Sequence, residues 1–247
     1  MEKPLRRFAA VLLLAVACPL AVSEPKNPRP DPALVAEFDL RAVRDGDWVE
    51  YDGSLRSKDG KEERWSYRLA CVGAEAETVR IETDRDLAGP EGSTWLVEAA
   101  RADGAIARFW RGKRGGTGEE VEAPKARAPR APVRLGKGTV STETVKLGDC
   151  ELECRKLVCE VTETPAGGKE KDRETYRWTR WTSKEIPFPR HVRRDGFDWE
   201  GDPGDSGAVA KMVFEYPDGD VVTTVARAWG TDANPSLSLP DSASPPK

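Results

Sequence analysis

The chain has 247 residues, a formal net charge of −4, and charged side chains at 33% of its positions. This mildly acidic balance disfavours a nucleic-acid-binding role, which requires a basic face. A chain of this length can bury one good core, so we expect a single domain with a strongly solvated surface.

The first 23 residues are typical of an export signal. Basic residues at positions 3, 6 and 7 precede an apolar run from Phe8 to Val22, which is too short to cross a bilayer as a permanent anchor. Two cleavage sites compete. Cleavage after Ser23 would release a soluble protein, whereas cleavage before Cys18 would follow from residues 14–18, LAVAC, which resemble the lipobox of bacterial lipoproteins.

Both cleavage sites predict a domain that works in the periplasm or cell envelope, where thiols meet an oxidising environment. An acylated Cys18 would be its attachment to a membrane. The proline-rich residues 24–36 are expected to form an extended spacer, followed by a β-rich domain over residues 37–230.

A short helix is predicted at residues 31–44, where Leu34, Phe38 and Val43 share an apolar stripe. Beyond it, apolar and polar residues alternate with a period of two, and Gly-containing turns join neighbouring runs into hairpins. The predicted fold is therefore mainly β, a single domain of about ten antiparallel strands curved into a half-barrel or open barrel, with one short N-terminal helix. The strands are expected at residues 47–56, 62–72, 78–83, 94–101, 105–113, 139–147, 150–164, 173–182, 208–216 and 220–229.

Three stretches depart from simple alternation. Residues 111–132 combine Gly, Pro and charge, which predicts a mobile loop, and residues 231–247 have the composition of a disordered tail. Within residues 150–164, the apolar positions shift phase after Cys154, and a bulge near residues 155–156 would return them to one face.

Tryptophan is frequent, with 8 Trp against 6 Phe and 4 Tyr. Trp65 and Tyr67 share one face of their predicted strand, and Trp178 and Phe214 lie in later strands. A sheet with one solvated side must point these rings toward its other side. They are therefore candidates for the lining of a ligand groove, and ordinary core packing is the alternative.

Four cysteines remain beside Cys18, an even number that suits two disulfides. Cys150 and Cys154 would lie roughly 13 Å apart along a strand, too far to bridge each other. If two bonds form, Cys71 therefore pairs with one of the cysteines at 150, 154 and 159. The alternative is that some of the four stay free and buried. The disulfide candidates are Cys71, Cys150, Cys154 and Cys159.

No catalytic, metal or cofactor motif is convincing. Residues 204–207, GDSG, match the nucleophile motif of chymotrypsin-like proteases around Ser206, but His191 is the one histidine and lies outside the expected arrangement. The same residues form an ordinary turn sequence. The three cysteines after residue 149 lack the paired spacing of structural zinc, so we expect no metal and no cofactor.

Five short segments occur in a recognisable order, namely GDWVEY at 46–51, ETVK at 143–146, ELEC at 151–154, WTSKEIP at 181–187 and HVR at 191–193. Together they resemble exported bacterial domains of uncharacterised function, whose half-barrel is similar to the periplasmic lipoprotein-carrier fold. The resemblance covers residues 46–230 and implies an open sheet with an apolar concave face for a lipid-like ligand, without catalytic residues. We therefore expect a non-enzymatic cell-envelope protein that binds a lipid-like ligand or an envelope protein. A hydrolase with an unrecognised carboxylate site and a purely structural protein are the alternatives.

Overall fold

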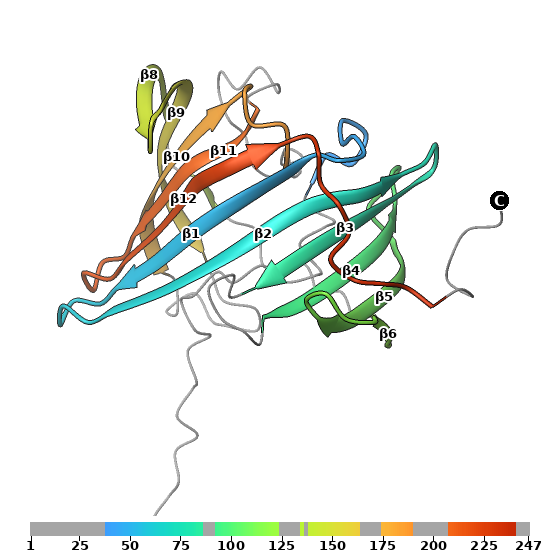
Figure 1. Cartoon of the computed structure of the whole chain (residues 1–247). Coiled ribbons are helices and arrows are strands. Elements are labelled where there is room, and N and C mark those ends of the chain that lie inside the picture. The colour runs from blue at the N-terminus through green and yellow to red at the C-terminus, as the bar shows by residue number, and fades with distance from the viewer. Residues whose placement is uncertain are drawn as a thin grey trace, which may run out of the picture.

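A computed structural model describes residues 38–85, 92–123, 134–135, 138–163, 174–189 and 207–240. These ranges contain strands, turns and loops, without a helix (Figure 1). No helix within them is therefore long and apolar enough to span a bilayer. The strands are β1 (Trp48–Arg56), β2 (Glu62–Ala74), β3 (Thr78–Arg85), β4 (Ser93–Ala100), β5 (Ile106–Lys113), β6 (Glu119–Glu120), β7 (Arg134–Leu135), β8 (Thr139–Leu147), β9 (Cys150–Glu163), β10 (Glu174–Ser183), β11 (Ala208–Glu215) and β12 (Val221–Gly230).

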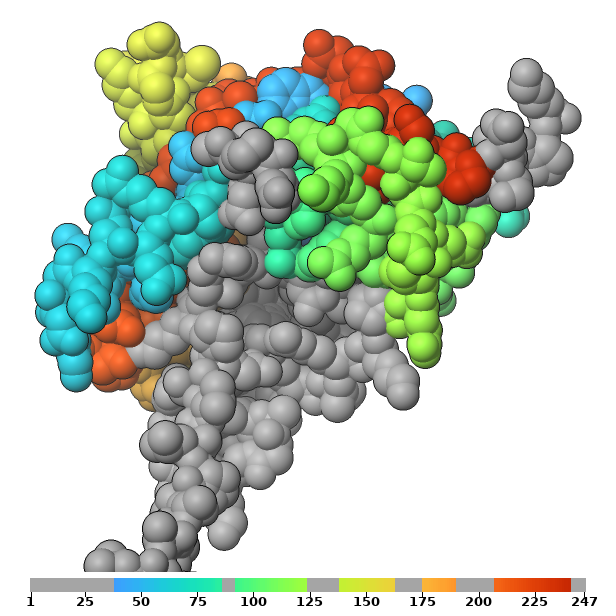
Figure 2. All heavy atoms as spheres, turned by 60° about the horizontal axis from the view of Figure 1, so that its bottom comes forward, coloured from blue at the N-terminus to red at the C-terminus, as the bar shows by residue number. Residues whose placement is uncertain are grey.

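All twelve strands belong to one sheet in the order β6-β5-β4-β3-β2-β1-β12-β11-β10-β9-β7, and β8 also pairs with β9. Every strand pairing is antiparallel. The end strands do not pair with each other, so the sheet stays open and forms the curved half-barrel that the sequence predicts (Figures 1 and 2). Register shifts between β1 and β12, β2 and β3, β4 and β5, and β10 and β11 bend it locally.

The ten predicted strands are all present, with ends that differ by at most two residues. The turns work as expected, since Gly60 and Gly219 adopt φ values of 79° and 93° in the β1–β2 and β11–β12 hairpins. The predicted mobile loop at 111–132 is wrong in part. Its first residues complete β5, and Glu119–Glu120 forms β6 along that edge, whereas residues 124–132 lie outside the described ranges.

The predicted bulge in β9 is also wrong. Strand β9 pairs with β8 and β10 without a register shift, so Leu152 and Cys154 lie on the face opposite to Leu157, Cys159 and Val161. All five side chains are buried. The phase shift in the sequence therefore reflects burial on opposite faces. The first part of β9 is covered on one face, and the second part is covered on the other.

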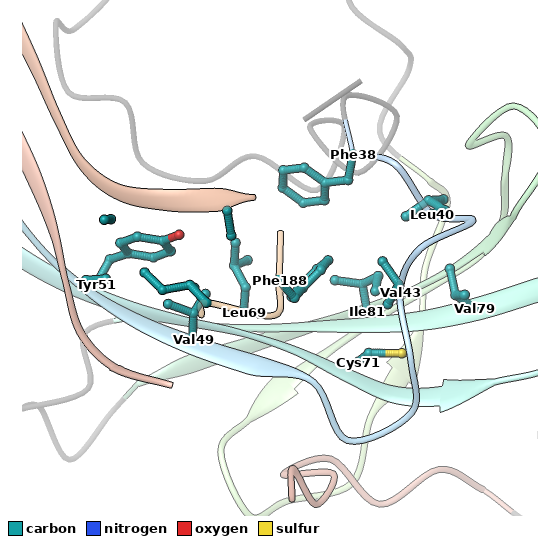
Figure 3. Packing of buried hydrophobic residues seen from close by; sticks show 14 of the residues in the cluster. Phe38, Leu40, Val43, Val49, Tyr51, Leu69, Cys71, Val79, Ile81 and Phe188 are labelled. Atoms are coloured by element: carbon teal, nitrogen blue, oxygen red, sulfur yellow. The ribbon is translucent and has the colours of Figure 1, made fainter. Parts of the chain in front are cut away.

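The sealed part of the core lies on one face of β1 to β4, which we call the concave face. Residues Phe38 to Val43 cross this face ahead of β1, together with Phe188 from the loop after β10 (Figure 3). The Phe38 and Phe188 rings meet edge to face at 5.6 Å. Phe38 to Arg44, the described part of the predicted helix, forms turns, and residues 31–37 lie outside the described ranges.

The opposite, convex face carries a feature that the sequence did not predict. Residues 231–240, here called the C-terminal segment, cross this face instead of being disordered (Figure 1). Leu237 packs with Leu96 and Trp110 in a small second core. Backbone hydrogen bonds join Ala233 to Gly46 and Ser238 to Gly116, so the segment connects the start of β1 to the β5–β6 turn.

Candidate functional site

Strand register gathers the aromatic candidates on the concave face. Trp65 stands opposite Gly53 of β1, and Tyr67 stands opposite Tyr51. A second row runs across the sheet from Leu55 through Val222, Phe214 and Trp178 to Cys159. We use the name aromatic floor for the rings at this end of the concave face, which are Trp65, Tyr67, Tyr176, Trp178 and Phe214.

The β2 side of the floor depends on a glycine. The Trp65 indole occupies the space beside Gly53, where a Cβ atom would overlap the ring atoms Cε2 and Nε1. Trp65 is 6% exposed, and its Nε1 finds no hydrogen-bond partner among the described residues. Next to it, Tyr67 stacks on Tyr51 with ring centroids 5.1 Å apart. The floor is therefore closely packed at this side.

Tyr51 and Tyr67 differ in how their hydroxyl groups are used. The Tyr51 hydroxyl donates to the Val209 carbonyl at 2.9 Å, which ties β1 to β11. Burial raises the pKa of both tyrosines above the usual value, because the phenolate would lose its hydration. Both rings thus stay neutral at physiological pH and present apolar faces.

The floor rings on β10 and β11 are less buried than Trp65. Trp178 and Phe214 lie parallel, with an interplanar angle of 3° and centroids 6.0 Å apart, and Tyr176 lies 5.8 Å from Phe214. All three rings are half-buried, unlike Val49 and Ile81 at the sealed end, which are fully buried. The concave face therefore passes from a sealed core to partly exposed aromatic rings.

The four candidate residues thus share one face but form two groups. Trp65 and Tyr67 belong to β2, and Trp178 and Phe214 belong to β10 and β11, with β1 and β12 between them. Val222 and Thr224 of β12 occupy the interval. Tyr176 was missed as a candidate, although its alternation with Trp178 placed it on the same face.

The structure does not support the disulfides that the sequence suggested. Cys71, Cys150, Cys154 and Cys159 are all free. Cys71 lies on β2 and the others on β9, and β1, β12, β11 and β10 stand between these strands. Such a separation exceeds the ~7 Å between Cα atoms that a disulfide tolerates. Burial raises the pKa of Cys71, Cys154 and Cys159 to about 11, so these thiols are unreactive.

Two buried carboxylates on the convex face are the strongest enzyme-like feature of the described residues. Glu82 is 0% exposed and Asp84 is 3% exposed, and the pKa of Glu82 is raised by burial and by the nearby Asp84. The Ser236 hydroxyl lies 2.7 Å from Glu82 and 2.8 Å from Asp84, and Arg68 lies within 3.8 Å of both. The C-terminal segment covers the pair, so it has no open cleft in which to meet a substrate.

Other candidates fall outside the described ranges, including Cys18, His191 and Ser206. Among the residues that are described, no three His, Cys, Asp or Glu side chains gather as metal ligands would.

Comparison with known proteins gives only distant likenesses. No family model and no curated protein matches the chain. Similar solved structures include a DUF1329 family protein from Desulfovibrio piger ATCC 29098, at 17% identity over 84% of this chain and 96% of that one, with a TM-score of 0.33. LprF from Mycobacterium bovis is 12% identical over 85% of this chain and 99% of its own, with a TM-score of 0.36. NE2245 from Nitrosomonas europaea, a LolA superfamily protein, is 12% identical over 84% and 96%, with a TM-score of 0.29.

Proposed function

We propose that this protein is an exported, non-catalytic cell-envelope protein that binds a lipid-like ligand on its aromatic floor. The observation that carries the proposal is the set of half-buried rings, Tyr176, Trp178 and Phe214, on the concave face of an open sheet. Partly exposed rings that gather on one face are a liability unless something covers them. An acyl chain would cover them and gain about 0.8 kcal/mol for each buried CH₂ group.

The geometry of the rings favours an acyl chain over a protein segment. Trp178 and Phe214 are parallel and offer flat apolar surfaces. Between them and Trp65, the β12 side chains are Val222 and Thr224, which add no charge. The alternative hydrolase is less well supported, because the C-terminal segment covers the buried pair of Glu82 and Asp84.

The proposal predicts that a brominated acyl chain quenches the floor tryptophans. Titration with a lysophospholipid brominated on its acyl chain should quench tryptophan fluorescence saturably, at one lipid per protein. Trp178→Phe should remove part of the quenched signal, because Trp178 would contact the chain. Trp48→Phe is the matched control, since Trp48 lies on the convex face, where its indole N–H donates to Asp232.

Two results would contradict this function. One is the absence of saturable quenching with every brominated lysophospholipid, and the other is an equal loss of quenched signal in Trp48→Phe and Trp178→Phe. Native mass spectrometry of the protein from its own envelope gives a second measurement, because it reports a bound lipid and acylation of Cys18 together.

A further inference from the structure

We propose that the bound lipid is an acyl lipid whose ester or amide carbonyl accepts a hydrogen bond from the indole of Trp65. This inference rests on the proposed function and adds the chemical group by which the ligand is recognised. Trp65 is 6% exposed, and its Nε1 is enclosed without a hydrogen-bond partner among the described residues. A buried donor without an acceptor costs free energy, so an acceptor that a ligand supplies would remove this cost.

Strand pairing places this donor in a row of residues that crosses the concave face. Gly53 of β1 pairs with Trp65 of β2 on one side and with Thr224 of β12 on the other. The indole edge that contains Cε2, Nε1 and Cζ2 lies beside Gly53, in the space that a Cβ atom would need. The N–H edge of the ring therefore reaches from β2 over β1, toward Thr224.

Thr224 brings a second polar group to the same point. It is 3% exposed, and its hydroxyl does not accept from Trp65 Nε1. A carbonyl oxygen has two lone pairs, so one ligand oxygen can accept from both the indole N–H and the hydroxyl. The carbonyl must move a side chain aside to reach the enclosed Nε1. Met212, the next residue in the row, is half-buried and has the unbranched, adaptable side chain that can repack in this way.

The row also places the carbonyl next to the half-buried rings of the aromatic floor. Thr224 pairs with Met212, and Phe214 follows two residues later on β11, so Thr224 and Phe214 are diagonal neighbours about 7–8 Å apart. Phe214 in turn pairs with Trp178. A lipid whose carbonyl lies at Trp65 and Thr224 would lay its chain on Phe214 and Trp178. A ligand without a carbonyl would cover the same rings and leave the buried donor unpaired.

Trp95 and Trp110 also have an Nε1 atom without a partner among the described residues, but neither belongs to the aromatic floor. The guanidinium of Arg85 lies 3.8 Å from the centroid of the Trp95 ring. Trp110 is enclosed in the second core on the convex face. Trp65 differs from both because its N–H lies on the floor, beside a second polar group.

The test compares two lysophosphocholines with the same brominated chain, one joined to glycerol by an ester and the other by an ether, which lacks the carbonyl. We expect the protein to bind the ester lipid about tenfold more tightly, as measured by quenching of tryptophan fluorescence. Trp65→Phe should remove most of this preference and still bind the ether lipid, because it keeps an aromatic ring and loses the N–H. Thr224→Val should reduce the preference and leave every tryptophan in place.

Trp95→Phe and Thr223→Val are the matched controls, and both should keep the preference. The first removes an indole N–H elsewhere on the concave face, and the second removes a hydroxyl on the convex side of β12. Equal affinities of the unaltered protein for the two lipids would overturn the carbonyl contact and leave the lipid-binding function standing. A full preference in Trp65→Phe, or an equal loss in Trp65→Phe and Trp95→Phe, would also overturn it. If neither lipid binds, both the proposed function and this inference are wrong.

Discussion

Gly53 and Trp65 show how one residue shapes the candidate site. Strand interiors rarely gain from glycine, which has no side chain to pack. Here the missing Cβ atom leaves the place that the Trp65 ring occupies, directly opposite on β2. The glycine therefore determines how closely the Trp65 ring of the aromatic floor approaches the backbone of β1.

Gly53→Ala should force the Trp65 ring out of this position. Overpacking of a buried site costs ~1–3 kcal/mol, so we expect the free energy of unfolding to fall by roughly that amount. Gly73→Ala is the control, because the added Cβ would meet only the flexible side chain of Arg80 at ordinary distances. Urea denaturation measures both. If Gly53→Ala is no less stable than Gly73→Ala, the close approach of ring and backbone is wrong.

At the scale of elements, the sequence predicted the strands well and the covering segments poorly. Alternation with a period of two located β8 at residues 139–147 and placed Trp65, Trp178 and Phe214 on a common face. Those signals are local. Glu82 alternates like a solvated residue of β3, and its cover, Ser236, lies 154 residues later. No local pattern reveals a partner at that distance, so the predicted disordered tail was wrong for residues 231–240.

The hydrogen bonds between β3 and the C-terminal segment require a proton on one of the two buried carboxyl groups. The Ser236 hydroxyl has one hydrogen and cannot donate to Glu82 and Asp84 at once. If Glu82 carries a proton, its carboxyl group donates to the Ser236 oxygen, and the Ser236 hydroxyl donates to Asp84. This arrangement agrees with the raised pKa of Glu82 that burial causes. The folded protein therefore holds this proton more tightly than the unfolded chain does.

This difference predicts a pH dependence of stability. Because the folded pKa of Glu82 lies above its unfolded value, the free energy of unfolding should fall as pH rises from the unfolded value of ~4.3 through the folded one, by ~1.4 kcal/mol for each unit of pKa shift. Glu82→Gln should flatten this fall, because the amide side chain cannot take up or release this proton. Urea denaturation between pH 4 and pH 7 measures it. A profile of Glu82→Gln that parallels the unaltered protein would count against a retained proton.

At the scale of the whole molecule, an open sheet must hold its curvature without the closed hydrogen-bond ladder of a barrel. Along strands β1 to β5, other parts of the chain pack against both faces of the sheet and stabilise its curvature. Phe38 and Phe188 fill the concave side at the sealed end, and the C-terminal segment connects β1 to the β5–β6 turn on the convex side. The aromatic floor is built from β2, β10 and β11, so its shape depends on how these strands curve.

Truncation after Gly230 should therefore weaken the whole domain. It would expose Leu96 and Trp110 to water, and would leave Glu82 and Asp84 buried without the hydrogen bonds of Ser236 and Leu237. Lost apolar burial and unpaired buried acceptors each cost on the order of 1–3 kcal/mol, so we expect a large drop in the denaturation midpoint and binding of an apolar dye. Truncation after Pro240 is the control, because it keeps every one of these contacts. If both truncated chains unfold at the same denaturant concentration as the full chain, the C-terminal segment contributes nothing to the fold, and the curvature of the sheet must be maintained by the sealed concave core alone.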